Sequence, residues 1–146
     1  MESSLKTRVF FSAVRKATSE GDTNNVQPGE VVTFTHNEVN IGSGMNPDTG
    51  IFTVPLSGIY SFSFSANCYK TSDYDDAATY IEVHKNDEKQ FLIMEDLRTN
   101  TYSLLGYSWT MYLAQNDKIH LYTAYNGLFV NRYINVRFNG QLLMAQ

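Results

Sequence analysis

Hydrophobic and polar residues alternate along most of the chain, which is the pattern of β-strands with one buried face. The clearest run covers residues 59–68, where Tyr60, Phe62 and Phe64 fall on one face and serines fall on the other. Aromatic residues favour strands, and no window of helical periodicity competes with this alternation. The run therefore predicts a strand with an aromatic inner face and an outer face of small polar residues.

Further runs of the same kind follow one another, with turns between them. The turns are rich in Gly, Pro, Asn and Asp, residues that favour tight changes of chain direction. The other predicted strands cover residues 9–14, 30–35, 51–54, 78–85, 89–94, 101–113, 118–125 and 133–145. About eight to ten strands in one chain predict an antiparallel sandwich, a jelly roll or a barrel.

Two of the predicted strands carry apolar residues on both faces. Leu104 and Tyr112 lie opposite the core-facing set of residues 101–113, and Leu143 lies opposite that of the last strand. A second apolar face needs a cover, which a partner subunit would supply. A monomer with scattered exposed apolar residues is the alternative. In residues 101–113 the core-facing residues are expected to be Leu105, Tyr107, Trp109, Met111 and Leu113. In residues 133–145 they are expected to be Ile134, Val136, Phe138, Gly140, Leu142 and Met144.

Length and charge narrow the class of protein. The 146 residues fit a single domain spanning residues 1–146, of which residues 1–7 are expected to form a flexible N-terminal segment. The formal net charge is -4, and clustered Lys and Arg side chains are lacking, so nucleic acid is not expected as a partner. No apolar run approaches the roughly 20 residues of a membrane span. The N-terminus also lacks the pattern of a signal peptide.

The sequence offers little for catalysis. Cys68 falls on the aromatic face of residues 59–68, so we interpret it as a small buried hydrophobe and not as a nucleophile. His84 and His120 lie mid-strand, opposite the apparent core face, and are interpreted as surface residues. The histidines lack metal-ligand spacing, and no nucleophile elbow or phosphate loop is present. We therefore expect a protein that is not an enzyme.

One segment resembles the signature of the C1q globular-head domain. That signature sets aromatic, Asn and Gly residues at fixed spacing and ends in a Gly-x-Tyr-x-Phe-x-aromatic strand. Met45 stands where the signature has an aromatic residue or Leu, and its large flexible side chain can fill the same position. The matching positions are Phe34, Asn40, Phe52, Gly58, Tyr60, Phe62 and Phe64.

The resemblance extends over nearly the whole chain. VFFSA and VRFNGQLL resemble the first and last strands of the family, while VHKNDEK and NDKIHL resemble two segments between them. The four segments are residues 9–13, 136–143, 83–89 and 116–121. C1q domains share a ten-stranded antiparallel jelly-roll sandwich with tumour necrosis factor and assemble as tight trimers. The resemblance therefore implies this fold and a homotrimer.

The resemblance also implies a role in recognition. The chain has no collagen-like stretch and is similar to the short, head-only members of the family. These imply a secreted, trimeric, lectin-like pattern-recognition protein of innate immunity, whose partners are carbohydrate, lipopolysaccharide-type ligands or other microbial surface polymers. The alternatives are a secreted signalling ligand of adipokine or synaptic-organiser type, whose partner is a protein receptor, and a structural assembly head.

The segment 122–133 is the first candidate for ligand binding. It combines aromatic residues with Asn and Arg, which suit the ring faces and hydroxyl groups of sugars, and loops on a rigid sandwich commonly carry recognition. A hairpin whose aromatic residues pack at a subunit interface is the alternative. The candidate residues are Tyr125, Asn126, Phe129, Asn131 and Arg132, with Tyr74 and Asp75 of the loop 69–76 as a second group.

The resemblance brings in calcium as the one metal to consider. Several C1q-type trimers hold calcium near the threefold axis through a carboxylate that precedes the long strand, and Asp96 falls at that place. Calcium needs several further oxygen ligands, and Ser103, at the other expected place, is a weak donor. A solvated loop carboxylate is the alternative for Asp96. No cofactor is otherwise required.

Overall fold

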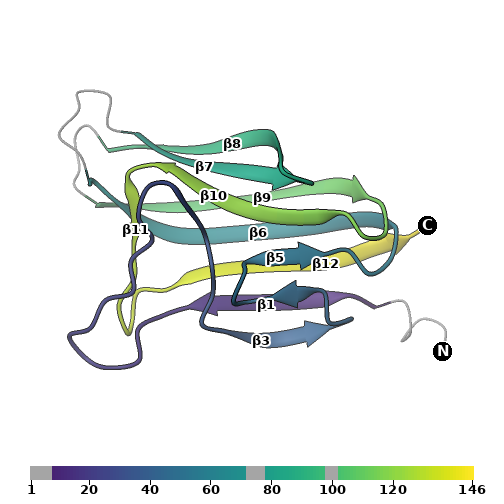
Figure 1. The fold of residues 1–146 in the computed structure, drawn as a ribbon, viewed down its shortest axis with the longest axis horizontal. Helices are drawn as coiled ribbons and strands as arrows, with labels where there is room; N and C mark the ends of the chain where they lie inside the picture. Colours follow the sequence, from purple (N-terminus) through teal and green to yellow (C-terminus); the bar gives the residue numbers. More distant parts are fainter. Residues whose placement is uncertain (1–7, 72–77, 98–101) are drawn as a thin grey trace.

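Two antiparallel sheets packed face to face make up the molecule (Figure 1). The computed structural model describes residues 8–71, 78–97 and 102–146. Within these ranges the chain forms twelve strands and no helix. The structure confirms the all-β jelly-roll sandwich expected from the sequence.

Sheet A is organised around β6, the strand with the aromatic alternation. The strands of sheet A are β1 (Phe10–Arg15), β3 (His36–Ile41), β6 (Gly58–Tyr69), β9 (Tyr102–Leu113), β11 (Gly127–Phe129) and β12 (Val136–Ala145). β9 pairs with one edge of β6 along its whole length, while β12 and β11 share the other edge. β1 pairs with β12, and β3 lies beyond β1.

Sheet B is organised around β10. Its strands are β2 (Glu30–Val31), β4 (Met45–Asn46), β5 (Ile51–Thr53), β7 (Ala78–Lys85), β8 (Glu88–Asp96) and β10 (Lys118–Tyr125). β7 pairs with one edge of β10, and β5 and β2 pair with the other. β8 lies beyond β7, and β4 lies beyond β5. Both sheets therefore draw neighbours from distant parts of the chain, as a jelly roll requires.

The core is an aromatic layer between the sheets. The rings of Tyr60, Phe62 and Phe64 point inward and are no more than 2% exposed. Phe11 of sheet A lies against Phe52 of sheet B, with ring centroids 4.7 Å apart. Because a buried aromatic side chain removes some 150–250 Å² from water, this layer is the main hydrophobic contribution to folding.

Gly140 is the position that lets these rings approach one another. In the register of sheet A it lies between Phe11 of β1 and Phe62 of β6. A Cβ atom at Gly140 would clash with the Phe11 ring and would also crowd Phe62. The missing side chain thus leaves room for Phe11, whose ring meets Phe138 edge-on with centroids 5.1 Å apart.

Three short strands lie in segments that the alternation did not mark as strands. β3 is a mostly polar strand at the edge of sheet A, with its side chains half-buried or exposed, and its two apolar residues, Val39 and Ile41, are too few to reveal a period. β4 and β11 are two and three residues long, too short to show a period. The predicted strand 30–35 pairs only over β2, although Val32 and Phe34 are buried as the pattern indicated.

Three side chains lie on a different face, or at a different depth, from the one expected. Met144 is 66% exposed because a bulge between Leu142 and Met144 shifts the register and reverses the face. Tyr107 faces the core side but is exposed because β9 lies at the edge of its sheet. His120, interpreted as a surface residue, is only 8% exposed.

Arg15 is a buried cation that holds the loop between β1 and β2. Its Nε donates to the Asn24 carbonyl oxygen at 2.7 Å, and one Nη donates to the Asn25 carbonyl oxygen at 2.8 Å. The other Nη donates to the Thr33 hydroxyl at 3.0 Å. Burial lowers the pKa of Arg15, and the nearby charge of Glu30 partly offsets that effect. These hydrogen bonds satisfy the N–H groups of the buried guanidinium. They also fix the loop, because several of its oxygen atoms accept from this one side chain.

Replacing Arg15 with Met should therefore destabilise the protein. The substitution keeps the aliphatic volume but leaves the loop carbonyl groups without their donor, so the free energy of unfolding should fall by roughly 2–4 kcal/mol. Chemical denaturation monitored by circular dichroism measures the loss. Arg132→Met removes the same charge at an exposed position and serves as the control, with an expected change within about 0.5 kcal/mol. Equal losses in both variants would contradict the role of Arg15.

Candidate functional site

The loop after β1 and the segment after β11 meet at the end of the sandwich opposite both chain termini (Figure 1), and a surface hollow that both segments line is a candidate binding site. Its volume is about 340 Å³, compared with about 380 Å³ and 490 Å³ for two other surface hollows in the described part of the chain. We call it the end hollow. Its lining residues are Glu20, Gly21, Asp22, Thr23, Phe129, Asn131, Arg132 and Tyr133.

The two walls of the end hollow are joined by hydrogen bonds, so the hollow is formed before any ligand arrives. The Asn24 N–H donates to the Val130 carbonyl oxygen at 2.8 Å, and the Ala17 N–H donates to the Asn131 carbonyl oxygen at 3.2 Å. The Val130 N–H donates back to Asn25 Oδ1 at 2.8 Å. A preformed site binds without first ordering its loops, which favours affinity.

One wall carries the hydrogen-bonding and aromatic groups predicted from the sequence. Asn131 Oδ1 accepts hydrogen bonds from the N–H groups of Tyr133 at 2.8 Å and Ile134 at 2.6 Å, which fixes the turn that follows. The Arg132 guanidinium lies over the Tyr133 ring at 5.6 Å from its centroid. Asn131 therefore shapes the wall, while Arg132 and Tyr133 face solvent.

The base of this wall is an aromatic cluster. Phe129 is half-buried and meets Tyr102 edge-on at a centroid distance of 5.6 Å and Tyr69 at 6.2 Å. Tyr69 and Tyr102 stack on each other at 6.4 Å. The ring of Phe129 is therefore held in one orientation at the edge of the hollow.

The structure separates the other predicted residues of the segment 122–133 from the end hollow. Asn126 is 4% exposed, donates to the Ala78 carbonyl oxygen at 2.9 Å and accepts from the Thr71 N–H at 2.9 Å. Its amide is thus used within the fold. Tyr125 is exposed but does not line the hollow, and its ring meets Tyr80 in sheet B at 5.1 Å. Phe129, Asn131 and Arg132 are the predicted residues that the hollow brings together.

Sequence reasoning missed the opposite wall and Tyr133. Residues 18–27 showed only the polarity of a loop, and a loop does not reveal which segment it will contact. Glu20, Asp22 and Thr23 meet the Arg132 segment because the loop pairs with residues 128–131. Tyr133 was assigned to the last strand, which in the structure begins at Val136.

The remaining predicted site residues are Tyr74, Asp75 and Asp96, of which Asp96 does not line the end hollow. Tyr74 and Asp75 lie outside the described residues. Asp96 is the exposed last residue of β8, opposite Ala78 in the register. Among the described residues no group of three or more His, Cys, Asp or Glu side chains could hold a metal ion. A calcium ion at Asp96 therefore remains a prediction that needs oxygen ligands from neighbouring subunits.

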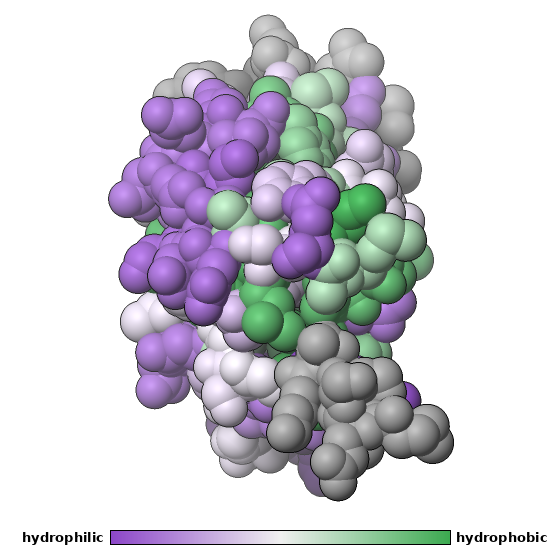
Figure 2. All heavy atoms as spheres, turned by 90° about the vertical axis from the view of Figure 1, so that its right-hand side faces the viewer, coloured by the Kyte–Doolittle hydropathy of each residue, from purple (hydrophilic) through white to green (hydrophobic). Residues whose placement is uncertain are grey.

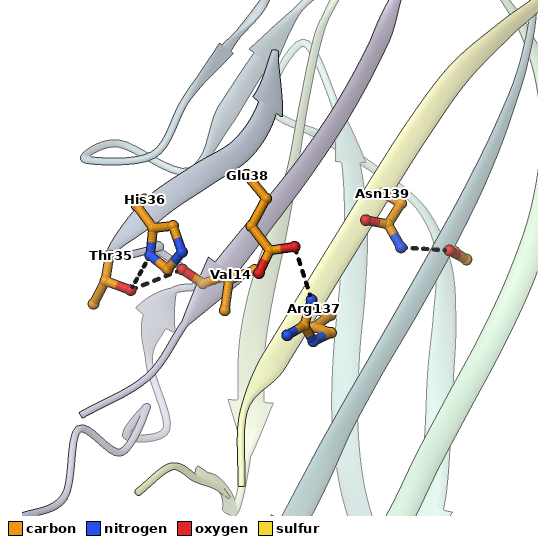
Figure 3. A network of polar contacts seen from close by, with 7 residues as sticks. Val14, Thr35, His36, Glu38, Arg137 and Asn139 are labelled. Carbon is orange, nitrogen blue, oxygen red and sulfur yellow. Dashed lines mark hydrogen bonds and ion pairs between the residues drawn. The ribbon is translucent and has the colours of Figure 1, made fainter. Parts of the chain in front are cut away.

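The outer face of sheet A is a second candidate surface, which we call the serine face. Its centre consists of small residues aligned across neighbouring strands: Ser12, Ser61, Ser63, Ser65, Gly106, Ser108 and Thr110. Figure 3 shows two polar contacts across it: Arg137 donates to Glu38 at 3.3 Å, and Asn139 donates to the Ser63 hydroxyl at 3.3 Å. This small-residue surface is hollowed beside Ser12, Ser61 and Ser63, where the hollow measures about 380 Å³, and it allows another chain to approach closely.

Large apolar side chains surround this centre. Leu104, the most exposed of them at 70%, lies next to Asn67 of β6. The exposed large apolar residues on this face include Phe10, Val39, Ile41, Ile59, Tyr102, Leu104, Tyr112 and Met144. Figure 2 looks onto the end that carries the termini and shows hydrophobic residues gathered on one side and hydrophilic residues on the other. An exposed apolar surface of this kind is typical of a protein interface.

The buried thiol and the stacked histidines are the other groups with chemistry of their own. Cys68 is fully buried, and burial raises the pKa of its thiol to about 11, which suits the small hydrophobe expected from the sequence. His84 stacks on His120 with ring centroids 4.7 Å apart, and His84 Nε2 lies 2.9 Å from Glu82 Oε1. Burial lowers the pKa of His120, and the charge of neighbouring His84 lowers it further, against a smaller opposing effect of Asp87.

Comparison with known proteins agrees with this architecture. The family model described as the C1q domain matches residues 10–143. No helix in the described part of the chain is long and apolar enough to cross a membrane.

Solved structures give the same result for the fold. The globular domain of zebrafish complement 1qA protein is 16% identical, with a TM-score of 0.71, and the match covers 94% of this chain and 99% of that one. Murine APRIL at pH 5.0 is 12% identical, with a TM-score of 0.66 and coverage of 94% and 100%. Eiger TNF from S. frugiperda is 13% identical, with a TM-score of 0.64 and coverage of 94% of both chains. At these identities the similarity shows the fold alone.

The stacked histidines generate a prediction about pH. Because the pKa of His120 is lowered in the folded state, the unfolded chain binds a proton more readily, so stability is lost as pH falls through about 6.5. Above that pH the contribution is fully present. Urea unfolding between mildly acidic and slightly alkaline pH should show this loss, and His120→Gln should reduce it.

His36→Gln is the matched control, since His36 lies at the start of β3, away from the stacked pair. If the pH dependence of the unfolding free energy is unchanged in His120→Gln, or falls equally in both variants, the assignment to His120 is wrong.

Proposed function

This chain belongs to the C1q domain family, and from that premise we propose that it is a secreted, trimeric recognition protein that binds glycans through the end hollow. The family supplies the context: its domains are typically extracellular, form trimers and act in recognition or as ligands. The observation that carries the proposal is the preformed end hollow, where aromatic and hydrogen-bonding side chains converge on a rigid support.

The chemistry of the end hollow suits a sugar. Phe129 and Tyr133 offer ring faces against which the apolar face of a pyranose can pack. Arg132 donates to sugar hydroxyl groups, and the Thr23 hydroxyl can donate or accept. Carbohydrate and lipopolysaccharide-type ligands both present such rings, so either class of microbial surface polymer fits this description.

Two surfaces of the sandwich support the trimer. The serine face of sheet A and its apolar surround form one contact surface. The β8–β9 edge between the two sheets forms another: there the Phe91 ring centroid lies 5.3 Å from that of Trp109 and 6.0 Å from that of Tyr107. Two different surfaces on one chain give a head-to-tail contact, which closes into a ring when the rotation between copies allows it. Three hollows on one body would raise avidity by roughly 10²–10⁴.

One observation favours a second candidate, a secreted ligand for a protein receptor. Sheet B also exposes apolar side chains, those of Leu92, Met94 and Tyr125, which a sugar-binding protein would not require. A receptor that packs on these side chains would bind without the end hollow. The two candidates therefore predict different sensitive residues.

Glycan binding should depend on the end hollow. Phe129→Ala and Arg132→Ala should each weaken binding on a glycan array at least about tenfold, as expected when a residue that contributes about 1.4 kcal/mol is removed. Each variant should keep the oligomeric state. Tyr125→Ala, which removes an exposed ring outside the hollow, is the control and should bind normally. Loss of binding in Tyr125→Ala alone would place the site on sheet B, and a wild-type protein that binds no glycan would contradict the proposal.

The trimer should depend on the serine face. Leu104→Lys puts a charge into the proposed interface without disturbing the core, since Leu104 is exposed in the single chain. Light scattering after size exclusion should give a trimer for the wild type and a monomer for this variant. Met94→Lys, at a position 57% exposed in sheet B, is the matched control and should remain trimeric. A wild-type mass of one chain at micromolar concentration would contradict the proposed assembly.

A further inference from the structure

The charges in the end hollow are unequal and are available to a ligand. Glu20 and Asp22 belong to one of the two segments that line the hollow and Arg132 to the other, so the lining carries two carboxylates and one guanidinium. All three residues are exposed. No ion pair within the described ranges joins Arg132 to either carboxylate, so a bound molecule can pair with all three groups.

This balance selects against anionic ligands. The hollow has a net charge of about -1, and the chain as a whole has a net charge of -4. A phosphate or carboxylate group in the hollow would be repelled by two carboxylates and attracted by one guanidinium, a balance that is unfavourable for an anion and favourable for an ammonium group. The hollow therefore discriminates by charge among ligands of the same shape.

The uncharged groups, together with the N–H donors of Arg132, define the rest of the ligand. The rings of Phe129 and Tyr133 need a flat apolar face, and the Thr23 hydroxyl and Arg132 need hydroxyl or ring oxygens. The hollow of about 340 Å³ suits one or two sugar units, since small-molecule sites usually measure roughly 300–1,000 Å³. A cation without such a ring would leave the aromatic groups unused.

We propose that the end hollow binds amino-sugar units whose amine is free and protonated. The ammonium group lies beside Glu20 and Asp22, the ring packs on Phe129 and Tyr133, and Arg132 donates to a hydroxyl or ring oxygen. This proposal rests on the proposed glycan-binding function and narrows it from sugars in general to cationic sugars. It also restricts lipopolysaccharide-type ligands to their unphosphorylated sugar units, since phosphorylated sugars would bind this hollow poorly.

Two tetramers that differ only in N-acetylation provide the test. Isothermal titration of the wild-type trimer with a β-1,4-linked glucosamine tetramer and an N-acetylglucosamine tetramer, at mildly acidic pH, compares a charged amine with a neutral amide. The glucosamine tetramer should bind at least about tenfold tighter, and added salt should weaken that preference. A galacturonic acid tetramer, which is anionic, should bind more weakly than either.

Removing charges inside and outside the end hollow distinguishes binding at the hollow from non-specific attraction of cations to an acidic protein. In the double variant Glu20→Gln/Asp22→Asn the two tetramers should bind equally. The control Glu88→Gln/Asp48→Asn removes the same charges from exposed positions outside the hollow and should keep the preference. If both double variants lose the preference equally, the protein attracts polycations without a site, and the proposal is overturned.

The outcomes distinguish this proposal from the broader one. If both tetramers bind equally to the wild type and Phe129→Ala weakens both, the end hollow is a glycan site without a charge preference, so only the amino-sugar proposal fails. If neither these tetramers nor any arrayed glycan binds, the glycan-binding function fails as well. Tighter binding of the galacturonic acid tetramer would overturn the charge argument directly.

Discussion

The approach of Phe11 to Gly140 is the contact on which the rest of the structure depends. Gly140 lacks a side chain where the ring of Phe11 must enter, and that ring joins sheet A to Phe52 of sheet B. Since interiors are packed almost as densely as crystals, filling this space would force the strands apart. The aromatic alternation of β6 then supplies the rest of the layer, and the two sheets are held at a fixed separation.

Because the interior of this sandwich is filled by aromatic side chains, its candidate binding sites lie on its surface. The loop that Arg15 holds and the segment that follows β11 meet at one end, because both are hydrogen-bonded to the sheets and to each other. The serine face arises from the same alternation that builds the core, since every residue between two inward aromatic residues must point outward. The core, the serine face and the end hollow are thus consequences of one strand pattern and its connecting loops.

Local patterns were sufficient for the fold but not for the end hollow. The period-two alternation of β6 and the signature residues around it predicted the sandwich, because they reflect burial directly. Phe129 and Arg132 were predicted as candidates because aromatic residues and Arg gather in one segment, and the structure places both in the lining of the hollow. Asp22 could not be found, since its place depends on a loop pairing across the molecule. The burial of Asn126 and His120 was missed for the same reason: local sequence does not show what covers a side chain.

The most direct test of this account is a crystal structure of the protein grown with a glucosamine oligosaccharide. The account predicts three chains arranged around their serine faces, each with a sugar ring between the Glu20–Thr23 wall and the Phe129–Tyr133 wall. Sugar bound on sheet B with the end hollow empty, or chains that assemble through sheet B and leave Leu104 in solvent, would contradict it.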